Sequence, residues 1–309
     1  MVVQWLLLAA GFGLLIKGAD FFVDGAVGIA KKFGIPQLII GLTVVALGTS
    51  APEAAVSIAS ATKGAADITI GNVVGSNILN IFIILGLTAV IVPIAVSSPT
   101  IKFDIPFMLG VTALMLFLGL DGGLGRIDAA ILVGLLAFYI FYLIRMVKSG
   151  KIVDTDDKPT KKLTVPVALI LAGIGIAMII FGSQLTVNAA TEIARSFGVS
   201  ERFIGLTVVA LGTSLPELFT SVTAARKGNA DIAVGNVVGS NIFNILFVVG
   251  VSGLITNIPF AAPFRVDTLI AIGAGALLLL LCFRKKKLFR WGGAILLAGY
   301  AAYFAFWLL

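Results

Sequence analysis

The chain carries two segments of nearly the same sequence, separated by a constant offset of 164 residues. Residues 41–80 and 205–244 match without a gap at 28 of 40 positions. This repeat predicts two similar halves that meet around one shared site. Each copy contains a single glutamate, Glu53 or Glu217, within an otherwise apolar stretch. A carboxylate in lipid surroundings costs at least ~2.5–3.5 kcal/mol, so its presence indicates a function.

The composition places the chain in a lipid bilayer. Of its 309 residues, 59% are hydrophobic and only 12% are charged, whereas about 25% charged residues is usual for a soluble domain. One cysteine and no histidine exclude an internal disulfide, a histidine proton relay and a His-liganded zinc site. The first apolar stretch has no basic segment before it, so we interpret it as a transmembrane helix and not as a cleaved signal.

The hydrophobic pattern predicts an all-α membrane protein with ten transmembrane helices, because each span needs roughly 20 mostly apolar residues. The helices are expected at about 3–29, 36–61, 68–95, 103–120, 127–147, 164–193, 201–225, 232–256, 266–283 and 289–308. The polar segment 148–163 separates the fifth helix from the sixth and is too short to form a domain.

The number of helices in each half predicts how the halves are related. Five is an odd number, so the second half, 164–309, must enter the membrane from the side opposite to the first half, 1–147. The halves are therefore expected to be inverted repeats about an axis in the membrane plane. In this topology 16 of the 22 Lys and Arg residues fall on the side of the 148–163 linker. That side is expected to be cytoplasmic, with both termini outside.

The second and seventh helices are each expected to break near the middle of the membrane. Pro52 has no backbone N–H and disfavours helix at the preceding residue, and Gly48 adds flexibility one turn earlier. Pro216 and Gly212 repeat the arrangement. Free backbone carbonyls at this depth are tolerated only where they line a cavity.

Each break brings a carboxylate and two hydroxyls within one helical turn. The residues are Thr49, Ser50 and Glu53 in the first copy, and Thr213, Ser214 and Glu217 in the second. The local alternative is that SAPE and SLPE are capping boxes, with Ser at the cap and Glu three residues later. A cap does not explain why the glutamate is placed in an apolar stretch, so we favour a site.

A second repeated motif, GNVVGSN, follows in the third and eighth helices. At about 100° per residue, polar side chains four apart share one helix face. The residues are Asn72, Ser76 and Asn80, and their copies Asn236, Ser240 and Asn244. The alternative is simple helix packing, with glycines for close approach and polar side chains bonded between helices. We expect this face to turn toward the broken helix and to complete a cage of oxygen atoms.

The predicted ligands are carboxylate, hydroxyl, amide and carbonyl oxygens, which suit a hard cation. Ca²⁺ and Na⁺ are favoured over Mg²⁺, which dehydrates reluctantly. Two ionised glutamates balance one Ca²⁺ or two Na⁺. Without a cation the two carboxylates repel each other, so at least one is expected to take up a proton or a cation. Such a site favours exchange over the return of an unloaded carrier.

The motifs GTSAPE, GTSLPE, GNVVGSNILN and GNVVGSNIFN strongly resemble the signatures of the Ca²⁺/cation antiporter superfamily and, within it, of sodium/calcium exchangers of the prokaryotic type. The similarity covers essentially the whole chain, with α-repeats at about 36–95 and 201–256. It implies that Glu53 and Glu217 bind both ions and that the first and sixth helices slide across the core. One departure stands out, because some relatives have Asp where this chain has Asn244.

The resemblance also implies roles for the other site residues. The backbone carbonyls of Thr49 and Thr213 are implied to bind Ca²⁺, and Asn80 and Asn244 to line the centre of the site. The flanking Na⁺ sites are implied to be formed by Ala46, Ser50, Ser76, Ala210, Thr213, Ser214 and Ser240.

The sequence therefore predicts a cell-membrane antiporter that exchanges Ca²⁺ for Na⁺ by alternating access. Ca²⁺/H⁺ exchange through the same glutamates is the alternative, and a cation channel is a weaker one. An enzyme is not expected, because no nucleophile–base pair or cofactor fingerprint is found. The expected partners are Ca²⁺, Na⁺, H⁺ in the alternative, and membrane lipid, but not nucleic acid. A monomer is expected to suffice for function.

One charge cluster in the first helix is not repeated. Lys17, Asp20 and Asp24 lie at i, i+3 and i+7, whereas the second copy has Gln184 and Asn188 at the acidic positions. We expect Lys17 to pair with Asp20, and a role in gating is the alternative.

Overall fold

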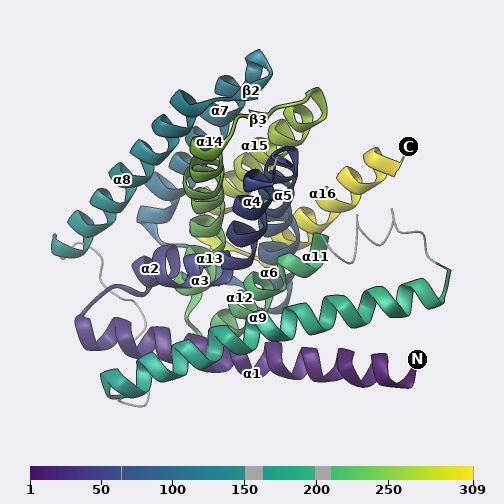
Figure 1. Cartoon of the computed structure of the whole chain (residues 1–309). Coiled ribbons are helices and arrows are strands. Elements are labelled where there is room, and N and C mark those ends of the chain that lie inside the picture. The colour runs from purple at the N-terminus through teal and green to yellow at the C-terminus, as the bar shows by residue number, and fades with distance from the viewer. Residues whose placement is uncertain (64, 150–162, 199–209, 309) are drawn as a thin grey trace.

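The computed structural model describes residues 1–63, 65–149, 163–198 and 210–308, and it is built almost entirely from helices (Figure 1). The η elements are π-helical turns except η4, which is a 3₁₀ turn. In chain order the elements are α1 (Val2–Phe33), α2 (Gln37–Ile40), η1 (Gly41–Val45), α3 (Ala46–Thr49), α4 (Ala51–Thr62), α5 (Asp67–Leu79), η2 (Asn80–Leu85), α6 (Gly86–Ile91), β1 (Ile94–Ala95), η3 (Thr100–Asp104), α7 (Ile105–Leu118), η4 (Gly119–Asp121), β2 (Gly123–Leu124), α8 (Arg126–Lys148), α9 (Val165–Ser196), α11 (Ala210–Thr213), α12 (Leu215–Arg226), α13 (Ala230–Phe243), η6 (Asn244–Val249), α14 (Gly250–Ile255), β3 (Ile258–Pro259), α15 (Ala262–Phe283), β4 (Lys287–Leu288) and α16 (Arg290–Leu308).

The all-helical membrane fold is confirmed. Seven helices of the described residues are long and apolar enough to cross a membrane, and a bent helix pair is an eighth candidate. The count of ten spans stays a prediction. Most of the polar linker and the start of the seventh expected helix, at 150–162 and 201–209, lie outside the described residues.

The expected break in the second helix is confirmed. The axes of Gln37–Thr49 and Ala51–Thr62 differ by 51°, and Ser50 between them leaves the helical region at ψ 5°. Pro52 lies in the first turn of α4, where a missing N–H is tolerated. Ser214 separates α11 from α12 in the same way, at ψ 4°.

The third and eighth helices are less regular than the sequence predicts. The expected unbroken helices 68–95 and 232–256 each contain a π-helical turn, Asn80–Leu85 and Asn244–Val249. The first also ends earlier than expected, at Ile91, because Pro93 disfavours helix at the residue before it. Single π-helical turns inside helices are frequent at functional sites, and here both begin at an asparagine of the repeated motif.

The offset of 164 relates the structural elements as well as the sequence. The elements α4, η2 and α6 have the same bounds as α12, η6 and α14 after the shift. Strand β1 pairs with β4, and β2 pairs with β3, both antiparallel. Because β1 corresponds to β3 and β2 to β4, the two strand pairs are equivalent to each other. Each pair joins an element of the first half to an element of the second.

Helices α1 and α9 lie side by side across one face of the bundle (Figure 1). Each has 32 residues, which is roughly 48 Å of helix. This exceeds the ~30 Å apolar core of a bilayer, so both helices must be strongly inclined if they lie within it. Small residues allow the contact, since a Cβ on Gly18 would lie 2.9 Å from the carbonyl oxygen of Gly175.

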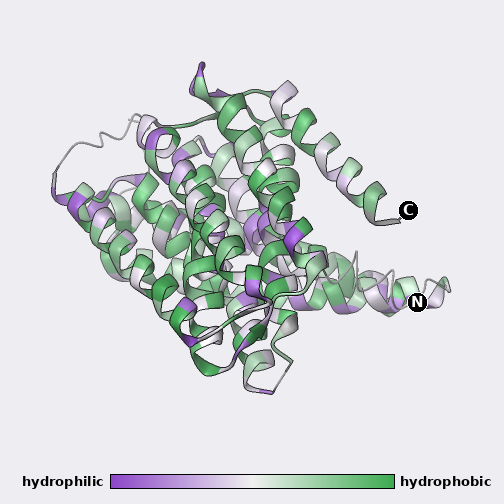
Figure 2. Cartoon of the chain, turned by 90° about the horizontal axis from the view of Figure 1, so that it is seen from above, coloured by the Kyte–Doolittle hydropathy of each residue, from purple (hydrophilic) through white to green (hydrophobic). Residues whose placement is uncertain are grey.

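The centre of the molecule is formed by the third and eighth expected helices. The most apolar windows of 68–91 and 230–255 are 72% and 78% buried, whereas those of the other candidate spans are 22–39% buried. Hydrophobic residues also cover most of the outer helices (Figure 2). The outer helices therefore expose apolar surface, while the repeated asparagine and serine motifs lie in the protein interior.

Candidate functional site

The two glutamates lie in the first turns of α4 and α12, directly after the helix breaks. Glu53 and Glu217 are each 1% exposed. The hydroxyl of Ser50 donates to Oε1 of Glu217 at 2.9 Å. The broken helix of one copy thus contacts the carboxylate of the other, and the partial positive charge at each helix N-terminus favours the anion.

The capping-box interpretation is wrong for the serines. Neither Ser50 nor Ser214 forms a side-chain hydrogen bond that caps its own helix. The Ser50 hydroxyl turns away from α4 toward Glu217. Oγ of Ser214 is buried without a hydrogen-bond partner among the described residues.

Around the first break, Thr49 and Ala46 contact helix α13 of the second half. Oγ1 of Thr49 lies 2.9 Å from Oδ1 of Asn236. The carbonyl oxygen of Ala46 lies 3.5 Å from the hydroxyl of Ser240. Their counterparts Thr213 and Ala210 are the ends of the short helix α11, and the side chain of Ala210 lies outside the described part.

The repeated GN-x-x-GSN helices pack against the glutamate helices as expected. Asn72 donates to the backbone carbonyl of Glu53 at 3.2 Å, and Asn236 donates to that of Glu217 at 3.3 Å. Each asparagine also donates to a serine hydroxyl four residues after the glutamate. The same pair of bonds therefore fixes the first turn of the glutamate helix in both copies.

Two further buried asparagines, Asn77 and Asn241, were not among the predicted site residues. They follow Ser76 and Ser240, which are both buried. Asn77 and Asn241 each donate to the other's backbone carbonyl at 3.2 Å. Their side-chain oxygens accept from the amides of Asn244 and Asn80, at 3.1 and 2.9 Å. Their exact repetition in both motifs was the available signal.

Four buried oxygens of the two glutamates and of two predicted asparagine ligands have no hydrogen-bond partner among the described residues. They are Oε2 of Glu53, Oε2 of Glu217, Oδ1 of Asn80 and Oδ1 of Asn244. An unpaired buried acceptor costs about 1–3 kcal/mol, and carboxylate and amide oxygens are typical ligands of hard cations. No cluster of three or more His, Cys, Asp or Glu side chains occurs in the described ranges, so the site has two carboxylates there.

Comparison with known proteins agrees with this geometry. The model of the family described as sodium/calcium exchanger protein matches residues 3–146 and 167–309. The chain belongs to the sodium/calcium exchanger family. This exchanger is 41% identical to CaxA of Alkalimonas amylolytica, and 34% identical to the sodium/calcium exchanger MaX1 of Methanosarcina acetivorans, in each case over 98% of both chains.

The fold of this exchanger is that of a solved relative. It matches a structure of the sodium-calcium exchanger NCX_Mj soaked with Na⁺ and Ca²⁺ with a TM-score of 0.84 and 35% identity, over 99% of this chain and 98% of that one. The resemblance found in the sequence is confirmed. The family consists of membrane transporters and not enzymes, and Na⁺ and Ca²⁺ are its transported ions and not cofactors.

The unrepeated charge cluster of the exchanger is arranged differently from our expectation. Asp20 pairs with Lys227 and not with Lys17: Nζ of Lys227 lies 3.4 Å from Oδ1 of Asp20 and 2.7 Å from Oδ1 of Asp24. Lys227 is the C-cap of α12. These ion pairs therefore connect α1 to the helix that carries Glu217.

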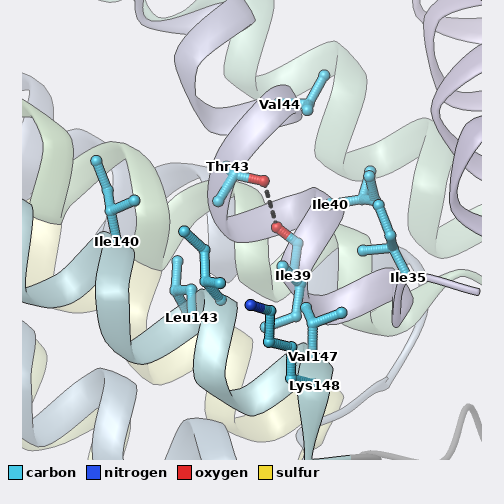
Figure 3. A pocket seen from close by; sticks show the side chains of 10 residues that line it. Ile35, Ile39, Ile40, Thr43, Val44, Ile140, Leu143, Val147 and Lys148 are labelled. Carbon is cyan, nitrogen blue, oxygen red and sulfur yellow. Dashed lines mark hydrogen bonds between the residues drawn. The ribbon is translucent and has the colours of Figure 1, made fainter. Parts of the chain in front are cut away.

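An apolar crevice of about 340 Å³ lies between α2–η1 and α8. Ile39 and Thr43 line one side, and Ile140, Leu143 and Lys148 the other (Figure 3). The Thr43 hydroxyl donates within its own helix, to the carbonyl of Ile39 at 2.6 Å. The crevice is lined by neither site glutamate and offers no set of cation ligands comparable to the site at the helix breaks.

Proposed function

We propose that this exchanger moves Ca²⁺ against Na⁺ across the cell membrane by alternating access, with Glu53 and Glu217 as the carboxylates that both ions share. The observation that carries the proposal is the meeting of the two buried glutamates at two helix breaks, linked by the bond from Ser50 to Glu217. Two carboxylates in so apolar a bundle are stabilised best by a cation held between them.

The remaining ligands follow from the groups around the breaks. We propose that Ca²⁺ is also bound by the carbonyls of Thr49 and Thr213, with the oxygens of Asn80 and Asn244 at the centre. Support comes from the burial of both asparagines and of Thr49. The proposed flanking Na⁺ ligands are Ala46, Ser50, Ser76, Ala210, Thr213, Ser214 and Ser240.

Charge explains why exchange is favoured over leakage. Two ionised glutamates are neutralised by one Ca²⁺ or by two Na⁺. With neither ion bound, the carboxylates repel each other, so the unloaded carrier switches sides reluctantly. If three Na⁺ enter, one positive charge remains, and transport couples to the membrane potential at ~2.3 kcal/mol per charge per 100 mV.

Alternating access requires two arrangements of the same chain around one site. We propose that 1–147 and 164–309 are inverted halves, that the 148–163 linker is cytoplasmic, and that both termini lie outside. The equivalent strand pairs and the reciprocal asparagine bonds support a twofold relation. The inclined pair α1–α9 is the proposed moving unit. A monomer suffices in this scheme, because one chain supplies both glutamates.

The experiment that tests the proposal is Ca²⁺ flux into proteoliposomes, with Na⁺, K⁺ and pH gradients varied one at a time. We expect a Na⁺ gradient at fixed pH to drive Ca²⁺ uptake. Uptake that follows only the pH gradient would establish Ca²⁺/H⁺ exchange instead. Steady single-channel currents in a planar bilayer would contradict alternating access altogether.

A further inference from the structure

We propose that Asn77 and Asn241 are positioning residues that aim the side-chain oxygens of Asn244 and Asn80 at the transported cation. The proposal rests on the function proposed above and extends the site by one asparagine in each half. All four asparagines are at most 3% exposed, so water does not determine the orientation of their amides.

The two positioning residues contact each other directly. Nδ2 of Asn77 donates to the backbone carbonyl of Asn241 at 3.2 Å, and Nδ2 of Asn241 donates to that of Asn77 at 3.2 Å. A backbone carbonyl only accepts hydrogen bonds. Each amide must therefore present its nitrogen to the partner's backbone, and this fixes its oxygen on the opposite side.

The oriented amides of Asn77 and Asn241 in turn orient the neighbouring asparagines. Oδ1 of Asn241 accepts from Nδ2 of Asn80 at 2.9 Å, and Oδ1 of Asn77 accepts from Nδ2 of Asn244 at 3.1 Å. An amide oxygen cannot donate. Asn80 and Asn244 must therefore turn their nitrogens toward the positioning residues, which leaves their own oxygens on the free side.

Those two oxygens lie in a buried environment without described partners. Oδ1 of Asn80 and Oδ1 of Asn244 are buried without a hydrogen-bond partner among the described residues, as is one carboxylate oxygen of each site glutamate. Buried acceptors that the fold leaves unpaired are suited to a desolvated cation. Each of the four amide nitrogens thus donates a hydrogen bond within the network, and two amide oxygens are left for the ion.

Without the positioning residue, the orientation of its neighbour is lost. The terminal torsion of an asparagine has two roughly equivalent states, so the Asn244 amide could present N–H groups to the cation. Loss of comparable orienting partners lowers metal affinity by about 10–100-fold. A misdirected amide dipole disfavours Ca²⁺ more than Na⁺, because its interaction scales with the charge of the ion.

The test is calorimetric titration of the purified full-length chain with Ca²⁺ and, separately, with Na⁺. We expect Asn77→Ala to lower Ca²⁺ affinity about tenfold or more, and to lower Na⁺ affinity less. In the Asn244→Ala background, Asn77→Ala is expected to add little, because the two act through one amide. The equivalent pair, Asn241→Ala with Asn80→Ala, gives an independent cycle if one variant does not fold.

The matched control is Thr88→Val in α6. Thr88 is also buried, but its hydroxyl donates to the carbonyl of Ile84 in its own helix, at 2.6 Å, so affinities should stay unchanged. Wild-type affinity in Asn77→Ala, or an equal loss with and without Asn244, would overturn the positioning role. Wild-type protein that neither binds Ca²⁺ nor exchanges it would instead contradict the proposed function.

Discussion

The two GTS-x-PE motifs of this exchanger have nearly the same sequence and the same backbone break, but they lie in different surroundings. Val56 on α4 is 44% exposed, whereas its counterpart on α12, Thr220, is fully buried. Ser50 binds the glutamate of the opposite copy, whereas Ser214 has no partner in the described part of the chain. Equal sequences therefore do not give equal sites.

The difference arises from residues that are not repeated. Helix α1 covers α12, with the rings of Phe12 and Phe219 6.0 Å apart and Lys227 bound to two aspartates of α1. The positions equivalent to those aspartates are Gln184 and Asn188, which carry no charge. The repeated motifs thus form reciprocal contacts at the centre, and unrepeated contacts make its two sides unequal, which the proposed alternating access requires of any single state.

The largest expected effect concerns the glutamate that each copy contains. Glu53→Gln and Glu217→Gln should each lower Ca²⁺ flux in proteoliposomes at least about 100-fold, because a direct anionic ligand of the divalent ion is lost. Both variants should remain folded, since glutamine fills the same volume. Wild-type flux in either variant would show that the carboxylates of the two copies do not act on one ion.

The next largest effect is expected at Asn244 and Asn80, which form equivalent hydrogen bonds in the two halves. Equivalent substitutions there test whether the two asparagines are also equivalent in function. In Asn244→Asp a carboxylate oxygen replaces the donor that faces Oδ1 of Asn77 at 3.1 Å, and in Asn80→Asp the same happens opposite Asn241. Each change leaves a buried acceptor unpaired, at about 1–3 kcal/mol of stability, and should alter the preference between Ca²⁺ and Na⁺. Thermal unfolding in chelator and ion titrations measure both effects.

Equal losses in the two variants are expected from the reciprocal bonds of the centre. A loss of stability confined to one variant would show that the two asparagines, like the two helix breaks, lie in unequal surroundings. An unchanged ion preference in both would show that these positions are peripheral to the site.

The parts of the site that depend on local chemistry could be predicted from the sequence, because few residue types are tolerated within a bilayer without a functional reason. An apolar stretch that contains Glu53 directly after Pro52 predicts a broken helix and a buried carboxylate from local chemistry alone. The contacts of Asn77 and Ser50 could not be predicted in this way. Both depend on which side chain of the other half lies opposite, 164 and 167 residues away.

The sequence also predicted that the two repeated copies are equivalent, whereas in the structure their surroundings differ. A repeat indicates which residues correspond, but it does not indicate how far α1 covers either copy. The pairing of Asp20 with Lys227 joins residues 207 positions apart, whereas the expected partner Lys17 was simply the nearest along the helix. The π-helical turns escaped prediction because no proline or glycine marks their first residues, Asn80 and Asn244.

A smaller effect should distinguish the two serines at the helix breaks. Ser50→Ala removes a buried hydrogen bond to a carboxylate and should lower the free energy of unfolding by about 1.5–3 kcal/mol. Ser214→Ala removes a hydroxyl without a partner in the described chain and should be neutral or slightly stabilising. Thermal unfolding of both variants in chelator, without Na⁺, makes the comparison, and equal losses would contradict the inequality of the two breaks.

The smallest expected effect concerns the ion pairs that connect α1 to α12. Lys227 and Lys63 are the C-caps of α12 and α4 and correspond to each other in the repeat. Lys227 pairs with Asp20 and Asp24 of α1, but no ion pair of Lys63 occurs among the described residues. Partly exposed ion pairs contribute about 0.2–1 kcal/mol each. Lys227→Gln should therefore weaken the interaction between α1 and α12 only modestly.

In an alternating-access carrier, a weaker cover shifts the balance between the two states and leaves the ion site intact. Lys227→Gln should therefore change the exchange rate by a few-fold, with Ca²⁺ affinity in titrations unchanged, and raised salt should shrink the difference from wild type because these charges are partly solvated. Lys63→Gln, the matched variant on the other copy, should leave the rate at the wild-type value. If both lysine variants change the rate equally, general surface charge explains the effect, and the ion pairs to α1 do not set the inequality between the two sides.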